Sequence, residues 1–259
     1  MIQYNPLPVL FSVGSIKIRS WGIMLALAFL LALIFMLKDA KKQKINSRHI
    51  WNLWFLSLIG GILGSRTLYV LLNIKYYLVN PLEVFQVWQG GMASYGGVAL
   101  AIILVLFYIK KKKLDIIKIT SLMAPYIALG FAIGRIGCFL NWDDFGVQSS
   151  LPWAISASGD IARHPTQLYL SALDFLLFFG LKKINKIKET LKNKAPAFLK
   201  FPTLAIFLFL FAIIRILIEP LRVYDTPNYR LVSISIFSAI ILGLFCLMLV
   251  KKIRKRKKS

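Results

Sequence analysis

The residues best suited to chemistry lie in one short segment, Gly134-Arg-Ile-Gly-Cys-Phe-Leu-Asn-Trp-Asp-Asp-Phe-Gly146. An arginine, an asparagine and two aspartates occur there at the end of an apolar run over 119–140. Ionisable groups at membrane depth are costly and usually face a protein interior or a wet cavity. A planar guanidinium can hold two oxygens of a phosphate group at once. The segment therefore predicts an anion site, most naturally for phosphate, where a helix leaves a lipid bilayer.

Arg135 is the strongest single candidate in this segment. It lies between Gly134 and Gly137, and the missing side chains leave room for a ligand to approach. Two other arginines within apolar runs have simpler explanations. Arg215 precedes Glu219 by four positions, which favours an ordinary ion pair on one helix. For Arg66 we favour snorkelling to the interface or pairing with a carboxylate such as Asp174.

The composition indicates a polytopic membrane protein. The chain has 259 residues, of which 58% are hydrophobic, and a mean hydropathy of +0.69. These values are too apolar for a soluble domain. We therefore predict an all-α fold with seven transmembrane helices, of which the fifth is short and carries Asp174. The seven apolar runs cover about 21–37, 51–72, 92–109, 119–140, 165–181, 203–218 and 231–250.

The positively charged residues cluster beside the apolar runs and do not indicate a basic face of a soluble domain. The net charge of +23 could suggest nucleic acid, but the lysines and arginines come in short clusters beside the runs. The densest clusters lie at 38–48, 110–118, 182–200 and 251–258. By the positive-inside rule the N-terminus lies outside and the C-terminus is cytoplasmic. We expect one integral membrane domain over 1–259 and no nucleic acid partner. Its outer-side loops lie at about 73–91, 141–164 and 219–230, and its basic cytoplasmic tail at 251–259 is drawn to anionic lipid.

Metals and cofactors are not expected. The two cysteines, Cys138 and Cys246, fall near opposite ends of their runs and cannot form a disulfide with each other. With only two histidines, the usual zinc-ligand spacings are absent. The sequence also lacks a phosphate-binding loop of the Walker type and a Rossmann fingerprint.

With this orientation, the polar residues gather toward the outer side. Arg66, Arg135 and Arg215 fall in the outer halves of their runs, so we expect a cavity at the level of the outer head groups. His164 follows Arg163 in the outer loop and reads more readily as a structural hydrogen-bonding residue than as a catalyst. In Gly90-Gly-Met-Ala-Ser-Tyr-Gly-Gly97, the glycine pairs suit either close helix packing or unusual backbone angles.

Taken together, these segments resemble the bacterial prolipoprotein diacylglyceryl transferases. The resemblance covers nearly the whole chain in the right order, and seven spans with the N-terminus outside also match. It rests on Trp21-Gly-Ile-Met, Gly60-Gly-Ile-Leu-Gly-Ser-Arg66, the segments at 90–97 and 134–146, Arg163-His-Pro-Thr-Gln-Leu-Tyr169 and Ile218-Glu-Pro-Leu-Arg-Val-Tyr-Asp225.

The resemblance implies a multi-pass enzyme of the bacterial cytoplasmic (inner) membrane whose active site faces the outer side. Such an enzyme transfers the diacylglyceryl group of phosphatidylglycerol to the lipobox cysteine of a prolipoprotein signal peptide, which is the first step of lipoprotein maturation. A thioether forms and glycerol phosphate leaves. The reaction requires deprotonation of a thiol whose free pKa is about 8.5. It also requires cations that stabilise the leaving phosphate.

By similarity, Arg135 binds the phosphate of phosphatidylglycerol. Asn141 and Gly146 shape the head-group site, and Asp143 takes the position of the family's usual loop glutamate. A second set of residues lies further along the chain. Arg222 corresponds to the family's second arginine and neutralises the departing phosphate, Glu219 orients Arg222, and His164 contributes to substrate binding.

The chain departs from the family pattern at the expected base. Tyr95 stands where many members have histidine, and a tyrosine with a pKa near 10 is a poor base at neutral pH. Either Tyr95 orients the substrate, or another group assists the deprotonation. Cys138 and Leu170 also replace common asparagine and acidic residues. These departures keep open a catalytically impaired paralogue that binds phospholipid. A lipid or solute carrier is a third possibility, although it would favour charges at mid-membrane and an internal repeat.

Overall fold

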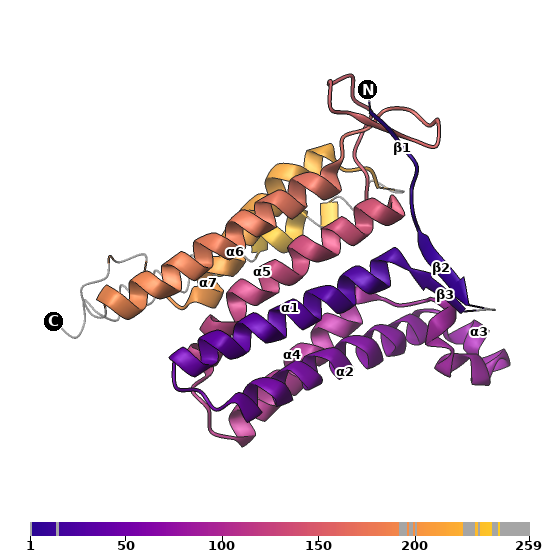
Figure 1. The fold of residues 1–259 in the computed structure, drawn as a ribbon. Coiled ribbons are helices and arrows are strands. Elements are labelled where there is room, and N and C mark those ends of the chain that lie inside the picture. The colour runs from indigo at the N-terminus through magenta and orange to yellow at the C-terminus, as the bar shows by residue number, and fades with distance from the viewer. Residues whose placement is uncertain are drawn as a thin grey trace. The chain divides into compact units, whose positions relative to one another are not determined.

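The computed structural model of the chain describes residues 2–13, 16–191 and 201–224, together with 196, 199, 231–232, 234–239 and 243 (Figure 1). The chain is mostly helical, as expected. Its long helices are α1 (Ser20–Lys42), α2 (Ser47–Leu72), α4 (Ser94–Lys111), α5 (Ile116–Asn141), α6 (Thr166–Leu191) and α7 (Thr203–Ile218). Shorter helical segments are α3 (Ile74–Val79), η1 (Pro81–Phe85), η2 (Val87–Gln89) and η5 (Glu219–Leu221).

Among the described residues, five helices are long and apolar enough to cross a membrane: α1, α2, α4, α5 and the stretch Thr203–Leu221. The protein is therefore a multi-pass membrane protein. The fifth predicted run does form a helix, α6, but this helix continues to Leu191 through a basic second half and is not one of the five. The predicted run over 231–250 lies mostly outside the described residues, as do Cys246, Asp225 and the tail 251–259.

The expectation of an all-α chain was incomplete, because four short strands are present. Strand β1 (Ile2–Tyr4) pairs in parallel with β4 (Ile155–Ala157), and β2 (Val9–Val13) pairs antiparallel with β3 (Ile16–Arg19). These segments precede α1 or lie between helices, where backbone N–H and C=O groups have no helical partners. Pairing as strands satisfies those groups.

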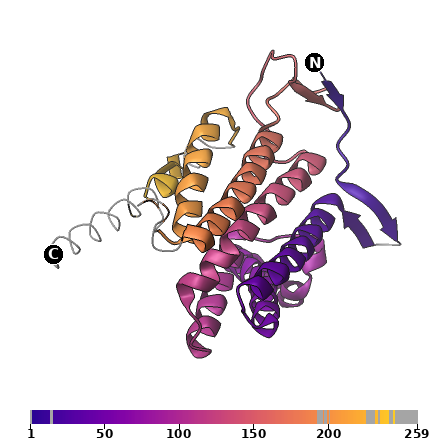
Figure 2. The same cartoon turned by 60° about the vertical axis from the view of Figure 1, so that its left-hand side comes forward.

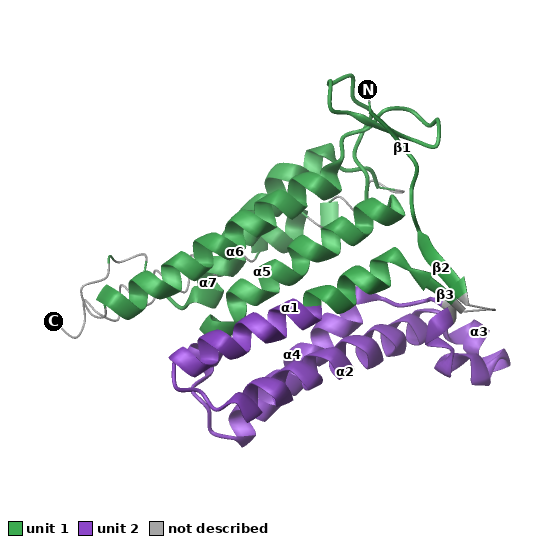
Figure 3. Cartoon of the chain, viewed as in Figure 1, with its two compact units in different colours: residues 1–28, 120–259 green, residues 29–119 purple. Residues whose placement is uncertain are grey.

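The chain forms two compact units, one of residues 1–28 with 120–259 and the other of residues 29–119 (Figure 3). In the first unit, α5, α6 and α7 run side by side (Figures 1 and 2). The Ser171 hydroxyl of α6 donates a hydrogen bond to the Ala132 carbonyl of α5, at 2.8 Å. This unit contains all the sequence-predicted site residues except Tyr95.

In the second unit, glycines allow α2 and α4 to pack closely. A Cβ added at Gly60 would lie 2.7 Å from the Cα of Ala101, and one at Gly64 would lie 2.7 Å from the Cβ of Leu100 and closer still to the Gly96 carbonyl oxygen. Small residues let helix backbones approach in this way. Close packing therefore accounts for Gly96, whereas Gly90 has a positive φ of 98° and serves the turn before α4.

Arg66 fastens the segment that follows α2 onto this helix. Its side chain is buried, and its guanidinium donates four hydrogen bonds of 2.5–2.9 Å to main-chain carbonyls. These carbonyls belong to Glu83, Val84, Gly90 and Gly91. The rings of Tyr69 and Tyr77 lie 5.9 and 5.3 Å from the guanidinium carbon. The partners of Arg66 are thus backbone carbonyls and aromatic rings, and not the carboxylate or the interface that we expected.

The close packing of α2 on α4 gives a testable prediction. We expect Gly64→Ala to lower the free energy of unfolding by about 1–3 kcal/mol, because the new methyl group meets backbone that cannot move aside cheaply. Gly61→Ala is the matched control, since a Cβ there meets nothing within 4 Å. The control should change stability by less than about 1 kcal/mol, in the stabilising direction. Thermal unfolding of both variants in detergent measures the difference, and equal unfolding temperatures would contradict the packing explanation.

Candidate active site

The loop that follows α5 is held between two distant segments of the first unit. The Gly146 amide donates to the His164 carbonyl at 2.9 Å, and the Val147 amide donates to the Leu221 carbonyl at 2.9 Å. A Cβ at Gly146 would lie 2.7 Å from the carbonyl oxygens of both His164 and Leu221. Only glycine fits there without displacing one of these segments. The predicted role of Gly146 in shaping the site therefore has a steric basis.

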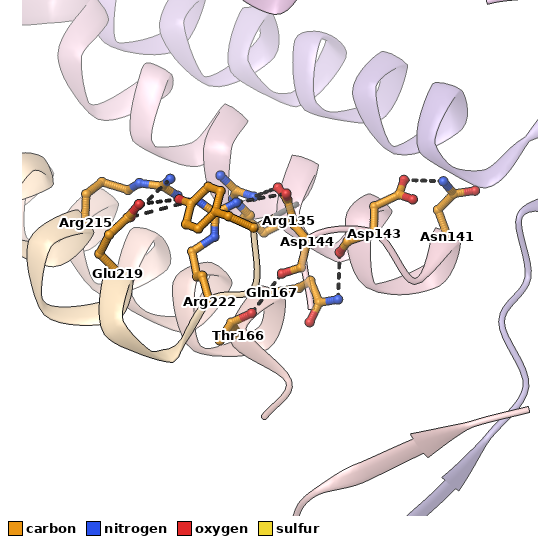
Figure 4. Close-up of polar contacts among 10 residues, drawn as sticks. Arg135, Asn141, Asp143, Asp144, Thr166, Gln167, Arg215, Glu219 and Arg222 are labelled. Atoms are coloured by element: carbon orange, nitrogen blue, oxygen red, sulfur yellow. Dashed lines mark hydrogen bonds and ion pairs between the residues drawn. The ribbon is translucent and has the colours of Figure 1, made fainter. Parts of the chain in front are cut away.

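The first turn of α6 fixes the backbone of the acidic pair. The Thr166 hydroxyl donates to the Asp144 carbonyl at 2.8 Å, and the Gln167 side-chain amide donates to the Asp143 carbonyl at 2.7 Å (Figure 4). Both donors are fully buried. Asp144 has a φ of 59°, in the left-handed region that aspartate tolerates better than most residues. The turn directs the two neighbouring carboxylates to different partners.

Asp144 bridges Arg222, which is buried, and Arg135, which is partly buried. Its Oδ2 lies 2.6 Å from Arg135 Nη1, and its Oδ1 lies 2.8 Å from Arg222 Nη2. The arginine side chains are 16% and 7% exposed, whereas that of Asp144 is 42% exposed. Burial alone would raise the pKa of Asp144, but Arg222 and Arg135 outweigh it and hold this pKa below its usual range. The carboxylate is therefore ionised at neutral pH, and both contacts are charge-assisted.

Glu219 is fully buried and contacts Arg222. One of its carboxylate oxygens lies 3.9 Å from Arg222 Nη1 and 3.9 Å from Arg215 Nη2. The Tyr224 hydroxyl donates a hydrogen bond to the other oxygen and accepts one of 2.7 Å from Arg222 Nη1. Glu219 and Tyr224 thus contact Arg222 through Nη1, whereas Asp144 contacts it through Nη2.

The contacts of Arg215 are not limited to an ion pair with Glu219 on the same stretch of helix. Its contact with Glu219 is long, at 3.9 Å. Its Nε and Nη1 are buried and have no hydrogen-bond partner in the described part of the chain. The guanidinium lies over the ring of Phe237, at 5.4 Å. The ordinary pairing that we favoured for Arg215 therefore accounts for only part of its side chain.

Asp174 adds a buried carboxylate to the same unit. It lies on α6, is 1% exposed, and interacts electrostatically with Arg135 and Arg215. Its Oδ1 accepts no hydrogen bond from the described residues. From the sequence, Asp174 was considered only as a charge within the fifth apolar run and as a possible partner of Arg66. The positive charges of Arg135 and Arg215 explain why an acidic residue can be buried on this helix.

The remaining predicted residues lie around this cluster. Asn141 donates through Nδ2 to the carboxylate of Asp143, so this pair forms its own contact on the loop (Figure 4). His164 Nδ1 lies 3.3 Å from the Tyr169 hydroxyl. Tyr95 belongs to the second unit, in the first turn of α4, and is 78% exposed.

Asp144 is the site residue that sequence reasoning missed. The resemblance drew attention to Asp143, because that position matches the family's loop glutamate, yet the neighbouring carboxylate contacts the arginines. The adjacent pair of aspartates was the available signal. Cys138 is a free thiol, and no cluster of three or more potential metal ligands occurs among the described residues.

Three arginines and an ionised carboxylate at a helix end form a site that suits an oxyanion. The family model described as "Prolipoprotein diacylglyceryl transferase" matches residues 8–251. The chain belongs to this family. The match spans every residue of the arginine cluster, so the described site lies within the part of the chain that defines the transferase family.

Several curated relatives are named phosphatidylglycerol–prolipoprotein diacylglyceryl transferase. The protein of Clostridium tetani is 35% identical over 247 residues, which cover 92% of this chain and 95% of the relative. That of Finegoldia magna is 35% identical over 214 residues, covering 83% of each chain. That of Bordetella parapertussis is 37% identical over 194 residues, covering 70% of this chain and 72% of the relative. The transferase family thus accounts for nearly the full length of this protein.

Proposed function

We propose that this protein transfers the diacylglyceryl group of phosphatidylglycerol to the lipobox cysteine of prolipoproteins, in the first step of bacterial lipoprotein maturation. The observation that carries the proposal is the pair of Arg135 and Arg222, bridged through the two oxygens of one carboxylate. Two guanidinium groups placed in this way suit one phosphate group. Family membership and the names of the relatives support the same reaction.

The proposed reaction is an alkyl transfer at carbon. The thiolate sulfur attacks the glycerol carbon that carries the phosphate, and the new S–C bond forms as the C–O bond to phosphate breaks. The bonding electrons leave with the phosphate oxygen, so negative charge grows on the departing glycerol phosphate. Arg135 binds this phosphate, and Arg222 neutralises it during departure. Preorganised cations act most strongly on charge that develops in the transition state.

The other residues support these two arginines. Glu219, with Tyr224, orients Arg222. Asn141, Asp143 and Gly146 shape the head-group site, and His164 contributes to substrate binding beside Gly146. No cofactor is needed, because the phosphate ester already supplies the leaving group.

Tyr95 is proposed to act at the thiol end of the reaction. We expect Tyr95→Phe to lower the rate of transfer about tenfold, the effect of losing one hydroxyl hydrogen bond in the transition state. Tyr95→His should retain transfer, because a neutral imidazole can accept the thiol proton. Tyr108→Phe is the matched control: Tyr108 lies on the same helix, and its hydroxyl bonds to His49 and Asn52. If Tyr95→Phe transferred the group at the wild-type rate, the hydroxyl of Tyr95 would have no role in the reaction.

We also propose the finer topology. The protein has seven transmembrane helices in one integral domain of the bacterial inner membrane, with the N-terminus outside and the C-terminus cytoplasmic. The support is the distribution of lysine and arginine, which cluster in every second segment that connects or follows the apolar runs. The active site then faces the outer side, where prolipoprotein signal peptides emerge. Reporter domains fused after Lys112 and after Asn80 should report opposite sides of the membrane.

The activity is tested in cells by complementation. A bacterial strain depleted of its own diacylglyceryl transferase should regain growth and lipid-modified lipoproteins when this chain is expressed. Failure to restore lipid modification, with the chain present in the membrane, would favour the impaired paralogue. The substitutions at Tyr95, Cys138 and Leu170 motivate that second candidate.

A further inference from the structure

We propose that Asp144 is an exchangeable internal anion that occupies the phosphate position between Arg135 and Arg222, and that the substrate phosphate displaces it. This inference rests on the proposed function. It adds a positioning residue that acts through the two arginines, and that controls how tightly the site holds the incoming phosphodiester and the departing glycerol phosphate.

The geometry of the bridge carries the inference. Each oxygen of the Asp144 carboxylate contacts a different arginine, Oδ2 with Arg135 at 2.6 Å and Oδ1 with Arg222 at 2.8 Å. A phosphodiester also presents two charged oxygens on one central atom, so it can make the same pair of contacts. The carboxylate and the phosphate therefore compete for the same donors.

The backbone and the side chain of Asp144 are constrained very differently. The backbone carbonyl accepts a hydrogen bond from the fully buried Thr166, and the loop is fixed further at Gly146. The side chain is 42% exposed, whereas those of Arg135 and Arg222 are only 16% and 7% exposed. Its carboxylate can thus rotate toward solvent without movement of the loop.

An internal anion lowers the electrostatic cost of holding two arginines next to each other before the substrate binds. Two neighbouring guanidinium groups, one buried and one largely shielded from solvent, repel each other and lose much of the solvation that water would provide. The single negative charge of Asp144 offsets part of this positive charge until the phosphodiester replaces it. After transfer, the released monoester carries a charge of about −1.5 to −2, so it would bind the arginines more tightly than the diester did. The returning carboxylate promotes release of this product.

The test measures binding of glycerol phosphate to the purified full-length chain by calorimetry in detergent. We expect Asp144→Asn and Asp144→Ala to bind glycerol phosphate about tenfold more tightly than the wild type, because the competing charge is gone. A purely structural bridge would have the opposite effect, since loosened arginines bind more weakly. Asp160→Asn is the matched control: Asp160 is an exposed aspartate paired with Arg163 at 3.3 Å, and its loss should leave binding unchanged.

The outcomes separate this inference from the proposed function. Equal or weaker binding by both Asp144 variants, with wild-type transfer intact, overturns the exchange of anions alone. Absence of transfer by the wild type overturns the proposed function, and the inference with it. A second readout needs no variant: infrared difference spectra of the wild type should show a changed carboxylate band when glycerol phosphate is added. An unchanged carboxylate region would overturn the exchange even if the variants failed to fold.

Discussion

Arg135→Lys lowers the rate of diacylglyceryl transfer by about 10²- to 10³-fold, the loss that follows removal of one preorganised donor of the transition state. The guanidinium of Arg135 is largely buried and contacts Asp144 through Nη1 at 2.6 Å. An ammonium group keeps the charge but offers no planar pair of donors for two phosphate oxygens. Initial rates with phosphatidylglycerol and a cysteine peptide measure the effect.

The control for this substitution is Arg48→Lys. Arg48 lies in the first turn of α2 and is exposed, so its replacement should leave the rate of transfer unchanged. Binding of phosphatidylglycerol should weaken in Arg135→Lys and stay the same in Arg48→Lys. Transfer by Arg135→Lys at the wild-type rate would refute the assignment of Arg135 to the phosphate.

Glu219→Gln destabilises the folded protein by about 3–5 kcal/mol, the usual cost of leaving buried charges without their partner. Glu219 is fully buried, and one of its oxygens lies 3.9 Å from both Arg215 and Arg222. Glutamine keeps the size of the side chain but cannot neutralise either arginine. For a chain of this length, the unfolding temperature should fall by roughly 10 °C.

Glu189→Gln is the matched control for the stability measurement. Glu189 is an exposed glutamate in the last turns of α6, and a surface change of this kind usually alters stability by about 0.5 kcal/mol or less. Thermal unfolding of both variants in the same detergent gives the comparison. If Glu219→Gln unfolded at the wild-type temperature, Glu219 would not be the buried counter-charge of the arginine cluster.

The apolar runs were the most predictable part of the fold. Hydropathy and length alone located α1, α2, α4, α5 and α7, because a membrane-crossing helix must be long and apolar to satisfy its backbone in lipid. None of the short strands was predicted from the sequence; for β1 and β4 the reason is that β1, at the start of the chain, pairs with a strand that begins only at Ile155. Local sequence carries little information about partners so far apart.

The same limit applies to the candidate site. Arg135 could be chosen because an isolated charge within an apolar run is conspicuous, whereas Arg222 and Glu219 were assigned from the resemblance to the transferase family. The choice between Asp143 and Asp144 depended on the positive φ of Asp144 and on hydrogen bonds from α6, which only the folded chain provides. Arg66 was likewise misjudged, because its carbonyl partners belong to a loop beyond the end of its own helix.

The central claim is that this chain moves a diacylglyceryl group from phosphatidylglycerol to a cysteine thiol. The most direct measurement uses the purified wild-type chain, phosphatidylglycerol and a synthetic lipobox peptide, followed by mass spectrometry. The account predicts a diacylglyceryl thioether on the peptide cysteine and one glycerol phosphate released per adduct, with no adduct when serine replaces that cysteine. An unmodified peptide, or one that carries only a fatty acyl group, would contradict it.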